Sequence, residues 1–338
     1  MTPDSSPLPV ASASPRPFHV FSPGDMYQLP EDRTDWLVHD LLPSVGTSLA
    51  IASPKCGKSV MTRQLCAFVS QGKPFLGRDV KRGKTLYVST QEQPGKIADH
   101  FRDLGCGEET FPFTVAGERI DPRSAVDQLS ATICGIPDLK LVVVDMVADI
   151  LPLHDTNDYS EMNTKFGLLR HLAEKHRLHV CLTHHLKKAQ TENAANASIG
   201  STAIAGSIDQ ILRLNVDARG QRSIDTVQRY GEVIPHTLLN WDAEQRAFYL
   251  GQGMEEVREQ RKEETNTRRT ECIFDAVRKY PGHTMEEILS EVTGKTTELR
   301  RIFRMLCTEG HLSRAGSGSK GDPYTYRLAD PINNDAAR

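Results

Sequence analysis

The segment Ile51–Ser59, which reads IASPKCGKS, carries the residues whose types and spacing point most clearly to chemistry. Its second half matches the phosphate-binding pattern G-x-x-x-x-G-K-[ST], with Gly57, Lys58 and Ser59 in the last three places. Backbone N–H groups can point at phosphate oxygens there, while the lysine reaches the β- and γ-phosphates and the serine hydroxyl binds Mg²⁺. We therefore expect this loop to bind a nucleotide through Ser53, Pro54, Lys55, Cys56, Gly57, Lys58, Ser59 and Val60.

The first glycine of the pattern is replaced by Ala52. Glycine tolerates backbone dihedrals that alanine does not, so this replacement bears on the geometry of the loop. The flanks support the interpretation, because Thr47–Ile51 suits a buried strand and apolar residues recur at helical spacing after Ser59. A strand, a tight loop and a helix is the arrangement that the pattern requires. The alternative is a chance GKS tripeptide at the start of a helix.

Two acidic residues follow other strand candidates. Leu141–Asp145 is an apolar run that ends in a carboxylate, which can hold Mg²⁺ together with Ser59. Glu92 follows the strand candidate Thr85–Ser89 and can orient water against the γ-phosphate, provided that this strand lies beside the strand of the phosphate loop. The alternative is that Glu92 compensates the dipole of the helix that follows it.

Composition narrows the class of protein. The chain of 338 residues is longer than one average domain, and 25% charged residues is normal for a globular protein. The net charge of −3 gives no global basic field, so a nucleic-acid site must be local. The seven cysteines are scattered and form no Cys-x-x-Cys pair, which argues against a disulfide framework or a zinc site and fits the cytoplasm. No apolar run is long enough to cross a bilayer, so we expect no membrane partner.

Strand and helix patterns alternate along the first two thirds of the chain, which predicts an α/β fold with a mostly parallel sheet and helices on both faces. Three apolar stripes at helical spacing and a Gly-rich hairpin pattern follow, as in a winged helix, a variant of helix-turn-helix. The charged run before them is typical of a solvated helix. We expect a disordered Pro/Ser-rich tail (1–20), an α/β domain (21–250), a charged linker (251–267), a winged-helix domain (268–330) and a flexible tail (331–338).

These motifs together resemble the RecA-like ATPases. The resemblance rests on IASPKCGKS, the turn Glu92–Pro94, the run VVVD that ends at Asp145, and Leu182–Lys188. The ending His-His-x-x-Lys is most similar to RepA-type plasmid and phage helicases, which are relatives of the DnaB-type replicative helicases. The Gly-Ser segment 200–209 also matches, and the resemblance covers residues 36 to 250. It implies a RecA-like sheet and a homo-oligomer, usually a hexameric ring, with ATP and Mg²⁺ at each subunit junction.

The resemblance also implies roles for single residues. Lys58, Ser59, Asp145 and Glu92 would serve nucleotide, metal and water activation, and His184 would sense the γ-phosphate at the end of its strand.

An arginine from the neighbouring subunit is expected at the γ-phosphate. Arg229 stands where the family often has a Lys-x-Arg pair, although Val227 replaces the lysine. The loss of that lysine bears on the speed of hydrolysis more than on nucleotide binding. The alternative is that Arg229 is an ordinary charge on a surface strand, and Arg213 and Arg222 are weaker candidates.

Two segments are candidate DNA contacts. In ring ATPases of this type, loops facing the central channel grip single-stranded DNA, and Lys187 and Lys188 begin such a polar loop here; the alternative is a disordered surface loop. In the C-terminal domain, a basic recognition helix and wing suit duplex DNA, although winged helices also bind proteins. The basic residues concerned are Lys295, Arg300, Arg301, Arg304, Arg314 and Lys320.

The sequence therefore predicts an ATP hydrolase that acts as a DNA helicase or translocase of a plasmid, phage or other mobile element. The alternative is an ATP-switched DNA-binding regulator or a recombination mediator. Small-molecule phosphoryl transfer ranks last, because no kinase-like lid is recognisable and the extra domain suits a polymer.

Overall fold

A computed structural model describes residues 20–28, 34–117, 120–152, 158–185 and 206–329. The chain forms two compact units, Met1–Asp35 and Trp36–Arg338. The described part of the smaller unit holds α1 (Pro23–Gln28), which has no buried residue. Of the predicted tails, 1–20 lies outside the described residues except for Val20, and 331–338 lies wholly outside them.

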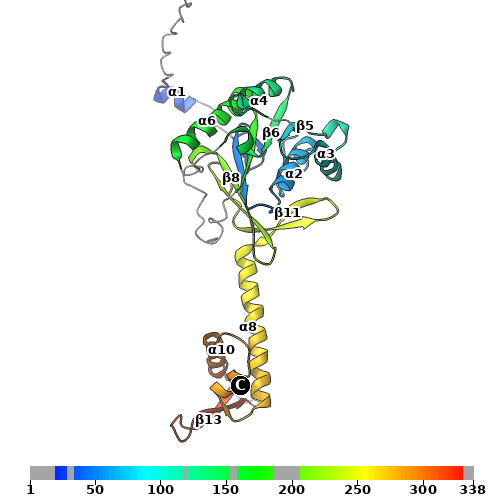
Figure 1. The fold of residues 1–338 in the computed structure, drawn as a ribbon. Helices are drawn as coiled ribbons and strands as arrows, with labels where there is room; N and C mark the ends of the chain where they lie inside the picture. The colour runs from blue at the N-terminus through cyan, green and yellow to red at the C-terminus, as the bar shows by residue number, and fades with distance from the viewer. Residues whose placement is uncertain (1–19, 29–33, 118–119, 153–157, 186–205, 330–338) are drawn as a thin grey trace, which may run out of the picture. The chain divides into compact units, whose positions relative to one another are not determined.

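The larger unit is built on a nine-stranded sheet with the order β11-β10-β9-β8-β3-β7-β6-β4-β5 (Figure 1). Strands β8, β3, β7, β6, β4 and β5 run parallel to their neighbours, and β9, β10 and β11 extend the sheet in antiparallel fashion. The predicted mostly parallel α/β sheet is confirmed. The bounds are β3 (Gly46–Ala52), β4 (Lys84–Ser89), β5 (Phe113–Ala116), β6 (Leu139–Asp145), β7 (His179–His185), β8 (Gln210–Val216), β9 (Arg222–Gln228), β10 (Thr237–Asp242) and β11 (Ala247–Gly253), with a separate pair β1 (Trp36–Val38) and β2 (Leu42–Pro43).

Helices cover both faces of the parallel strands (Figure 1). Every residue of β3 is buried, as expected for a parallel strand covered on both sides. Its side chains alternate between two cores: Ala50 and Ala52 belong to one, and Leu49 and Ile51 to the other. The first core lies under α2 (Lys58–Gln71) and α3 (Pro94–Asp103), and the second under α4 (Ala125–Cys134), α5 (Val147–Ile150) and α6 (Tyr159–His176).

Local sequence fixes the ends of the helices that matter for the site. Helix α2 starts directly after Gly57 and ends at Gly72, whose φ of 74° and N–H bond to the Phe68 carbonyl form a left-handed cap. Helix α6 starts after Asp158, whose carboxylate accepts the N–H groups of Ser160 and Glu161. A short 3₁₀ helix, η1 (Glu108–Thr110), follows α3.

The C-terminal part has its own hydrophobic core, formed by the end of α8 (Met254–Lys279), α9 (Met285–Ser290) and α10 (Thr296–Thr308). A three-stranded sheet of order β12-β14-β13 completes it. Its strands are β12 (His283–Thr284), β13 (Leu312–Ala315) and β14 (Thr325–Leu328). Helix α8 is continuous from the end of β11, so the stretch predicted as a charged linker and the first helix of the predicted winged helix are one element. Among the described helices, none has the length and apolar character that a membrane span needs.

Candidate nucleotide-binding site

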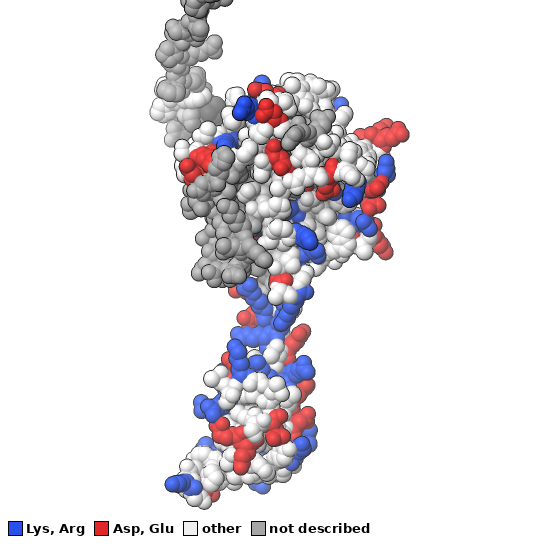
Figure 2. Space-filling view, viewed as in Figure 1, with Lys and Arg blue, Asp and Glu red and all other residues white. Residues whose placement is uncertain are grey.

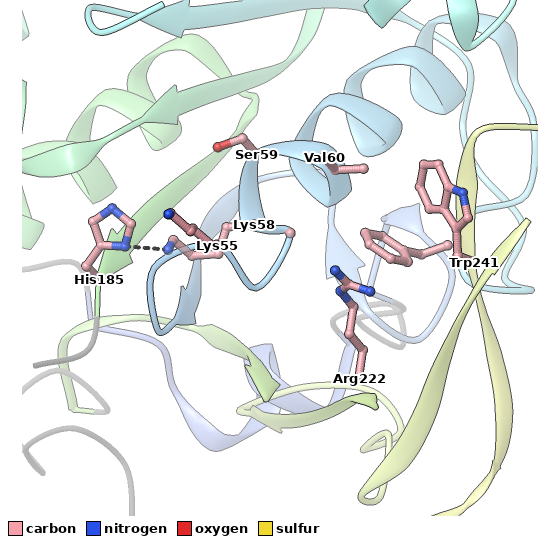
Figure 3. A pocket seen from close by; sticks show the side chains of 9 residues that line it. Lys55, Lys58, Ser59, Val60, His185, Arg222 and Trp241 are labelled. Carbon is pink, nitrogen blue, oxygen red and sulfur yellow. Dashed lines mark hydrogen bonds between the residues drawn. The ribbon is translucent and has the colours of Figure 1, made fainter. Parts of the chain in front are cut away.

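A cavity of about 480 Å³ lies at the start of α2. This volume is in the range of small-molecule sites. Figure 3 shows Lys55, Lys58, Ser59 and His185 toward one end of the cavity, with Arg222 and Trp241 toward the other. The full lining consists of Lys55, Gly57, Lys58, Ser59, Val60, His185, Arg222, Trp241 and Phe248. The predicted phosphate loop therefore forms a wall of a cavity at the carboxyl ends of parallel strands, where open α/β sheets bind ligands.

The loop does not need a glycine at position 52. Ala52 ends β3 in regular pairing with His185 of β7 and Leu214 of β8, and its φ is not positive. Within the loop, Lys55 and Gly57 have positive φ values of 65° and 103°. A Cβ on Gly57 would lie 2.9 Å from a ring carbon of Phe248, so the second glycine of the pattern is required and the first is not.

Of the other predicted loop residues, Ser53, Pro54 and Cys56 belong to the loop without lining the cavity. Cys56 is buried, and its carbonyl oxygen accepts a hydrogen bond of 3.3 Å from Arg222 Nε. These residues shape the loop from behind, and the cavity wall is formed by the residues that follow.

Lys58 is held inside the loop by two acceptors. Its Nζ donates to the Ala52 carbonyl at 3.3 Å and lies 2.6 Å from Nδ1 of His185 (Figure 3). An ammonium group has no acceptor, so Nδ1 accepts this bond and His185 is neutral. Burial and the charge of Lys58 lower the pKa of His185, which favours that neutral form. Burial also lowers the pKa of Lys58, and the Asp145 carboxylate opposes that shift.

The two adjacent histidines lie on opposite faces of β7. His185 pairs with Ala52, whose side chain belongs to the core under α2, and His184 pairs with Ile51, whose side chain belongs to the other core. Side chains alternate along a strand, so only His185 faces Lys58. The sequence assigned this place to His184, and that prediction is wrong by one residue.

Asp145 ends β6 and is almost completely buried. Its Oδ2 accepts a hydrogen bond of 2.6 Å from the Tyr87 hydroxyl, and its Oδ1 accepts one of 2.6 Å from Thr183 Oγ1. Burial raises the pKa of Tyr87 well above its usual value, so the phenol stays a donor. Each oxygen keeps a lone pair for water, which fits a carboxylate that binds Mg²⁺ through water.

Glu92 is joined to Asp145 through a buried arginine. Its Oε1 lies 2.6 Å from Nη2 of Arg63, whose side chain is 7% exposed on α2. The Nε of Arg63 donates to the Tyr87 hydroxyl at 3.0 Å, and that hydroxyl donates to Asp145. Burial works against the charge of Arg63, but Tyr87 and Glu92 give a net rise in its pKa.

The strand order contradicts the reason given for Glu92. Strand β4, which precedes this residue, is separated from β3 by β7 and β6. The fully buried cores of β6 and β7 need a strand on each side, and they take up the positions between β3 and β4. The expected adjacency is therefore wrong. Glu92 still follows the same edge of the sheet, because Ser89 of β4 pairs with Asp145 of β6.

A family model described as an AAA domain matches residues 14–191, which include the phosphate loop, Glu92, Asp145 and His185. The chain belongs to the AAA domain family. It is therefore a P-loop ATPase at the level of the family, as the motifs predicted.

Two solved structures are similar to the AAA domain. The ATPase domain of a helicase has 12% sequence identity and a TM-score of 0.44, over 61% of this chain and 84% of that chain. The RadB recombinase has 16% identity and a TM-score of 0.45, over 61% of this chain and 90% of that chain. Among curated proteins, none matches the sequence.

The aromatic end of the cavity comes from residues beyond the matched part of the AAA domain. Trp241 of β10 and Phe248 of β11 stand opposite each other in the strand register, and their rings meet edge to face with centroids 5.1 Å apart. Gln64 of α2 holds β11 in place, because its amide exchanges two hydrogen bonds with the backbone of Phe248. Sequence analysis missed both aromatic residues. A tryptophan opposite a phenylalanine across a short turn was the available signal.

Arg222 and Arg229 have exchanged the importance that the sequence gave them. Arg222 lines the cavity of the AAA domain, and its guanidinium lies 5.9 Å from the centre of the Phe248 ring. Arg229 does not line the cavity; it is 46% exposed and lies 3.4 Å from Asp209 Oδ1. Its predicted role concerns a neighbouring subunit and stays a prediction.

The predicted DNA contacts lie outside the cavity of the AAA domain. Lys187 and Lys188 are outside the described residues. In the C-terminal part, Arg300 pairs with Glu286 at 2.7 Å and Arg301 with Glu298 at 3.4 Å, and Arg314 lies over the Tyr324 ring at 4.7 Å. The remaining predicted contacts, Lys295, Arg304 and Lys320, are exposed.

Proposed function

We propose that this protein is an ATP-dependent DNA helicase or translocase, similar to the RepA-type replicative helicases of plasmids, phages and other mobile elements. The observation that carries the proposal is the cavity itself. It joins a lysine-bearing phosphate loop at one end to a tryptophan and an arginine at the other, which are the surfaces that a nucleoside triphosphate requires.

The phosphate end binds by exchange of partners. Lys58 leaves the Ala52 carbonyl and the neutral ring of His185, and donates instead to the β- and γ-phosphate oxygens. His185, released from the lysine, is the neutral imidazole nearest to the γ-phosphate and replaces His184 as its sensor. The N-terminus of α2 adds the positive end of its dipole.

The base end is apolar and aromatic. Trp241 offers a ring face to the base, and Arg222 offers a planar cation held by the Cys56 carbonyl and the Phe248 ring. Val60 covers the start of α2 between the two ends (Figure 3).

Ser59 and Asp145 are the residues that would hold Mg²⁺. The donor set fits, because a hydroxyl and a water-linked carboxylate leave room for phosphate oxygens and water, which this ion prefers to an all-protein cage. The described residues accordingly contain no cluster of three metal-binding side chains. When bound, the ion would neutralise phosphate charge.

Glu92 orients the attacking water and accepts its proton. In this structure Oε1 is occupied by Arg63, so the carboxylate must turn away from the guanidinium before it can accept that proton. Tyr87 and Thr183 meanwhile keep Asp145 in place.

Translocation needs neighbouring subunits and DNA. In the proposed hexameric ring, Arg229 reaches the γ-phosphate of an adjacent subunit, which its 46% exposed side chain allows. Lys187 and Lys188 grip single-stranded DNA in the central channel, and the C-terminal winged helix holds duplex DNA through α10 and its wing.

The second candidate is an ATP-switched DNA-binding regulator. The ion pair between Arg63 and Glu92 favours it, because a restrained carboxylate slows hydrolysis while ATP binding is unaffected. Turnover of ATP with and without single-stranded DNA, measured together with displacement of a labelled strand, separates the two. The helicase requires stimulation by DNA and strand displacement. ATP binding and ring formation with turnover that ignores DNA would establish the regulator instead.

A further inference from the structure

Helix α8 contains a long stretch that packs against nothing in the described structure. Its buried residues are Met254 and Val257 at the start, and Ile273, Ala276 and Val277 near the end. No residue from 258 to 272 is buried. A helix that is polar all round needs ion pairs or a partner to be stable.

The charges on this stretch are segregated. The positive residues follow the spacing i, i+3, i+4, i+10 and i+11, which places them within about a third of the helix circumference at 3.6 residues per turn. The glutamates occupy the rest of the circumference. Figure 2 shows Lys and Arg side chains gathered along this part of α8. The positive residues, which we name the α8 basic face, are Arg258, Arg261, Lys262, Arg268 and Arg269.

The α8 basic face is poorly neutralised by the helix itself. Lys262 lies 3.7 Å from Glu259, and Arg261 donates to the Gln221 amide oxygen at 2.7 Å. Among the described residues, no carboxylate lies within ion-pair distance of Arg258, Arg268 or Arg269.

The spacing along the sequence works against self-neutralisation. Arg258 and Lys262 are like charges four residues apart, and so are Glu259 and Glu263. Such pairs destabilise an isolated helix, whereas a helix that only bridges two domains gains from opposite charges at this spacing. The pattern therefore indicates a partner that compensates the basic face.

We propose that the α8 basic face binds the phosphate backbone of duplex DNA. The whole chain is negative at −3, so this is a local field for a polyanion and not part of a general positive charge. The face is about 16 Å long at 1.5 Å per residue, or about five base-pair steps. It holds no aromatic residue between positions 254 and 272, and such residues are what single-stranded sites use to stack bases.

The path of the chain agrees with this partner. The end of α8 belongs to the core of the C-terminal part, together with α10, on which basic residues were predicted to contact duplex DNA. A duplex held by α10 would meet a second row of phosphate contacts on the same continuous helix. This inference extends the proposed function but does not depend on ATP turnover.

The test is the salt dependence of duplex binding. A short fluorescein-labelled duplex is titrated with the full chain by fluorescence anisotropy, without nucleotide, over a series of KCl concentrations. The variant Arg258→Gln/Arg268→Gln/Arg269→Gln should lower the slope of log K against log salt by about 2 to 3, because each lost phosphate contact removes about 0.9. The affinity should fall by at least about tenfold at moderate salt.

The matched control removes the same charge elsewhere. Arg102→Gln/Arg123→Gln/Arg278→Gln changes three exposed arginines, and Arg102 and Arg278 are already ion-paired with Asp99 and Asp275. This control should keep the slope and affinity of the wild type. An equal loss in both variants, or no loss in the first, would overturn the proposal.

Two further arms keep the result interpretable. Helical circular dichroism checks that α8 persists, and Arg258→Lys/Arg268→Lys/Arg269→Lys, which keeps the charge, should retain the wild-type slope. A loss confined to single-stranded DNA of the same length would refute the duplex assignment. ATP turnover without DNA is recorded in parallel, so a failure of the proposed function remains distinct from a failure of this one.

Discussion

Replacing Trp241 with alanine removes the exposed ring at the base end of the cavity while the phosphate loop stays intact. Stacking of a base on an aromatic side chain contributes about 1–3 kcal/mol by alanine substitution. Trp241 is 41% exposed and touches Phe248 edge to face, so its ring face is available for stacking. Because an open site keeps the base partly in water, we expect the lower part of that range, about 1–2 kcal/mol. This corresponds to an increase of about 5- to 30-fold in the Kd for ATP.

Isothermal titration calorimetry with ATP and with inorganic triphosphate separates the two ends of the cavity. Trp241→Ala should weaken ATP and leave triphosphate unchanged, and Trp241→Phe should restore most of the ATP affinity. Equal weakening of both ligands would mean that the substitution disturbs the loop through Phe248 and Gly57. Unchanged ATP affinity would refute the assignment of this end to the base.

Two other substitutions test the catalytic carboxylate and a buried histidine. Glu92→Gln should keep ATP binding but slow hydrolysis by about a hundredfold or more, and a normal rate in a turnover assay would remove Glu92 from its role. The ring nitrogens of His179 form hydrogen bonds with the Pro43 carbonyl and the Ser48 hydroxyl, and burial lowers its pKa to about 4 from 6.5. Below pH 6.5 the unfolded chain therefore takes up a proton that the folded chain does not, so stability is complete above that pH and falls by up to about 3 kcal/mol toward pH 4. In urea denaturation, His179→Gln should lose that much less than the wild type between pH 7 and pH 4, and parallel curves would contradict the assignment.

The sequence was sufficient for the features that depend on local pattern. The phosphate loop was recognisable because a strand, Gly57-Lys58-Ser59 and a helix are contiguous in the chain. Asp145 was recognisable because a fully buried parallel strand reads as an apolar run, and its last residue lies at the carboxyl edge. The replacement of a glycine by Ala52 proved harmless, because that position still belongs to β3.

Other features depend on contacts between distant segments. A shift of one residue along a strand moves a side chain to the opposite face, and for this reason His184 was predicted where His185 lies. The position of Trp241 beside the loop depends on an antiparallel extension of the sheet, which local patterns do not order. Arg63 lies in the middle of an ordinary amphipathic helix, and only the fold reveals its contact with Glu92.

The account depends most on the loop at Ile51–Ser59 binding a triphosphate that is then hydrolysed. Steady-state ATP turnover of the wild type and of Lys58→Ala, with Mg²⁺ and single-stranded DNA present, tests this directly. The lysine is a buried cation whose present acceptors are a carbonyl and a neutral histidine, so its loss should abolish turnover. Turnover that is unchanged in Lys58→Ala, or a wild type with no affinity for adenine nucleotides, would contradict the account.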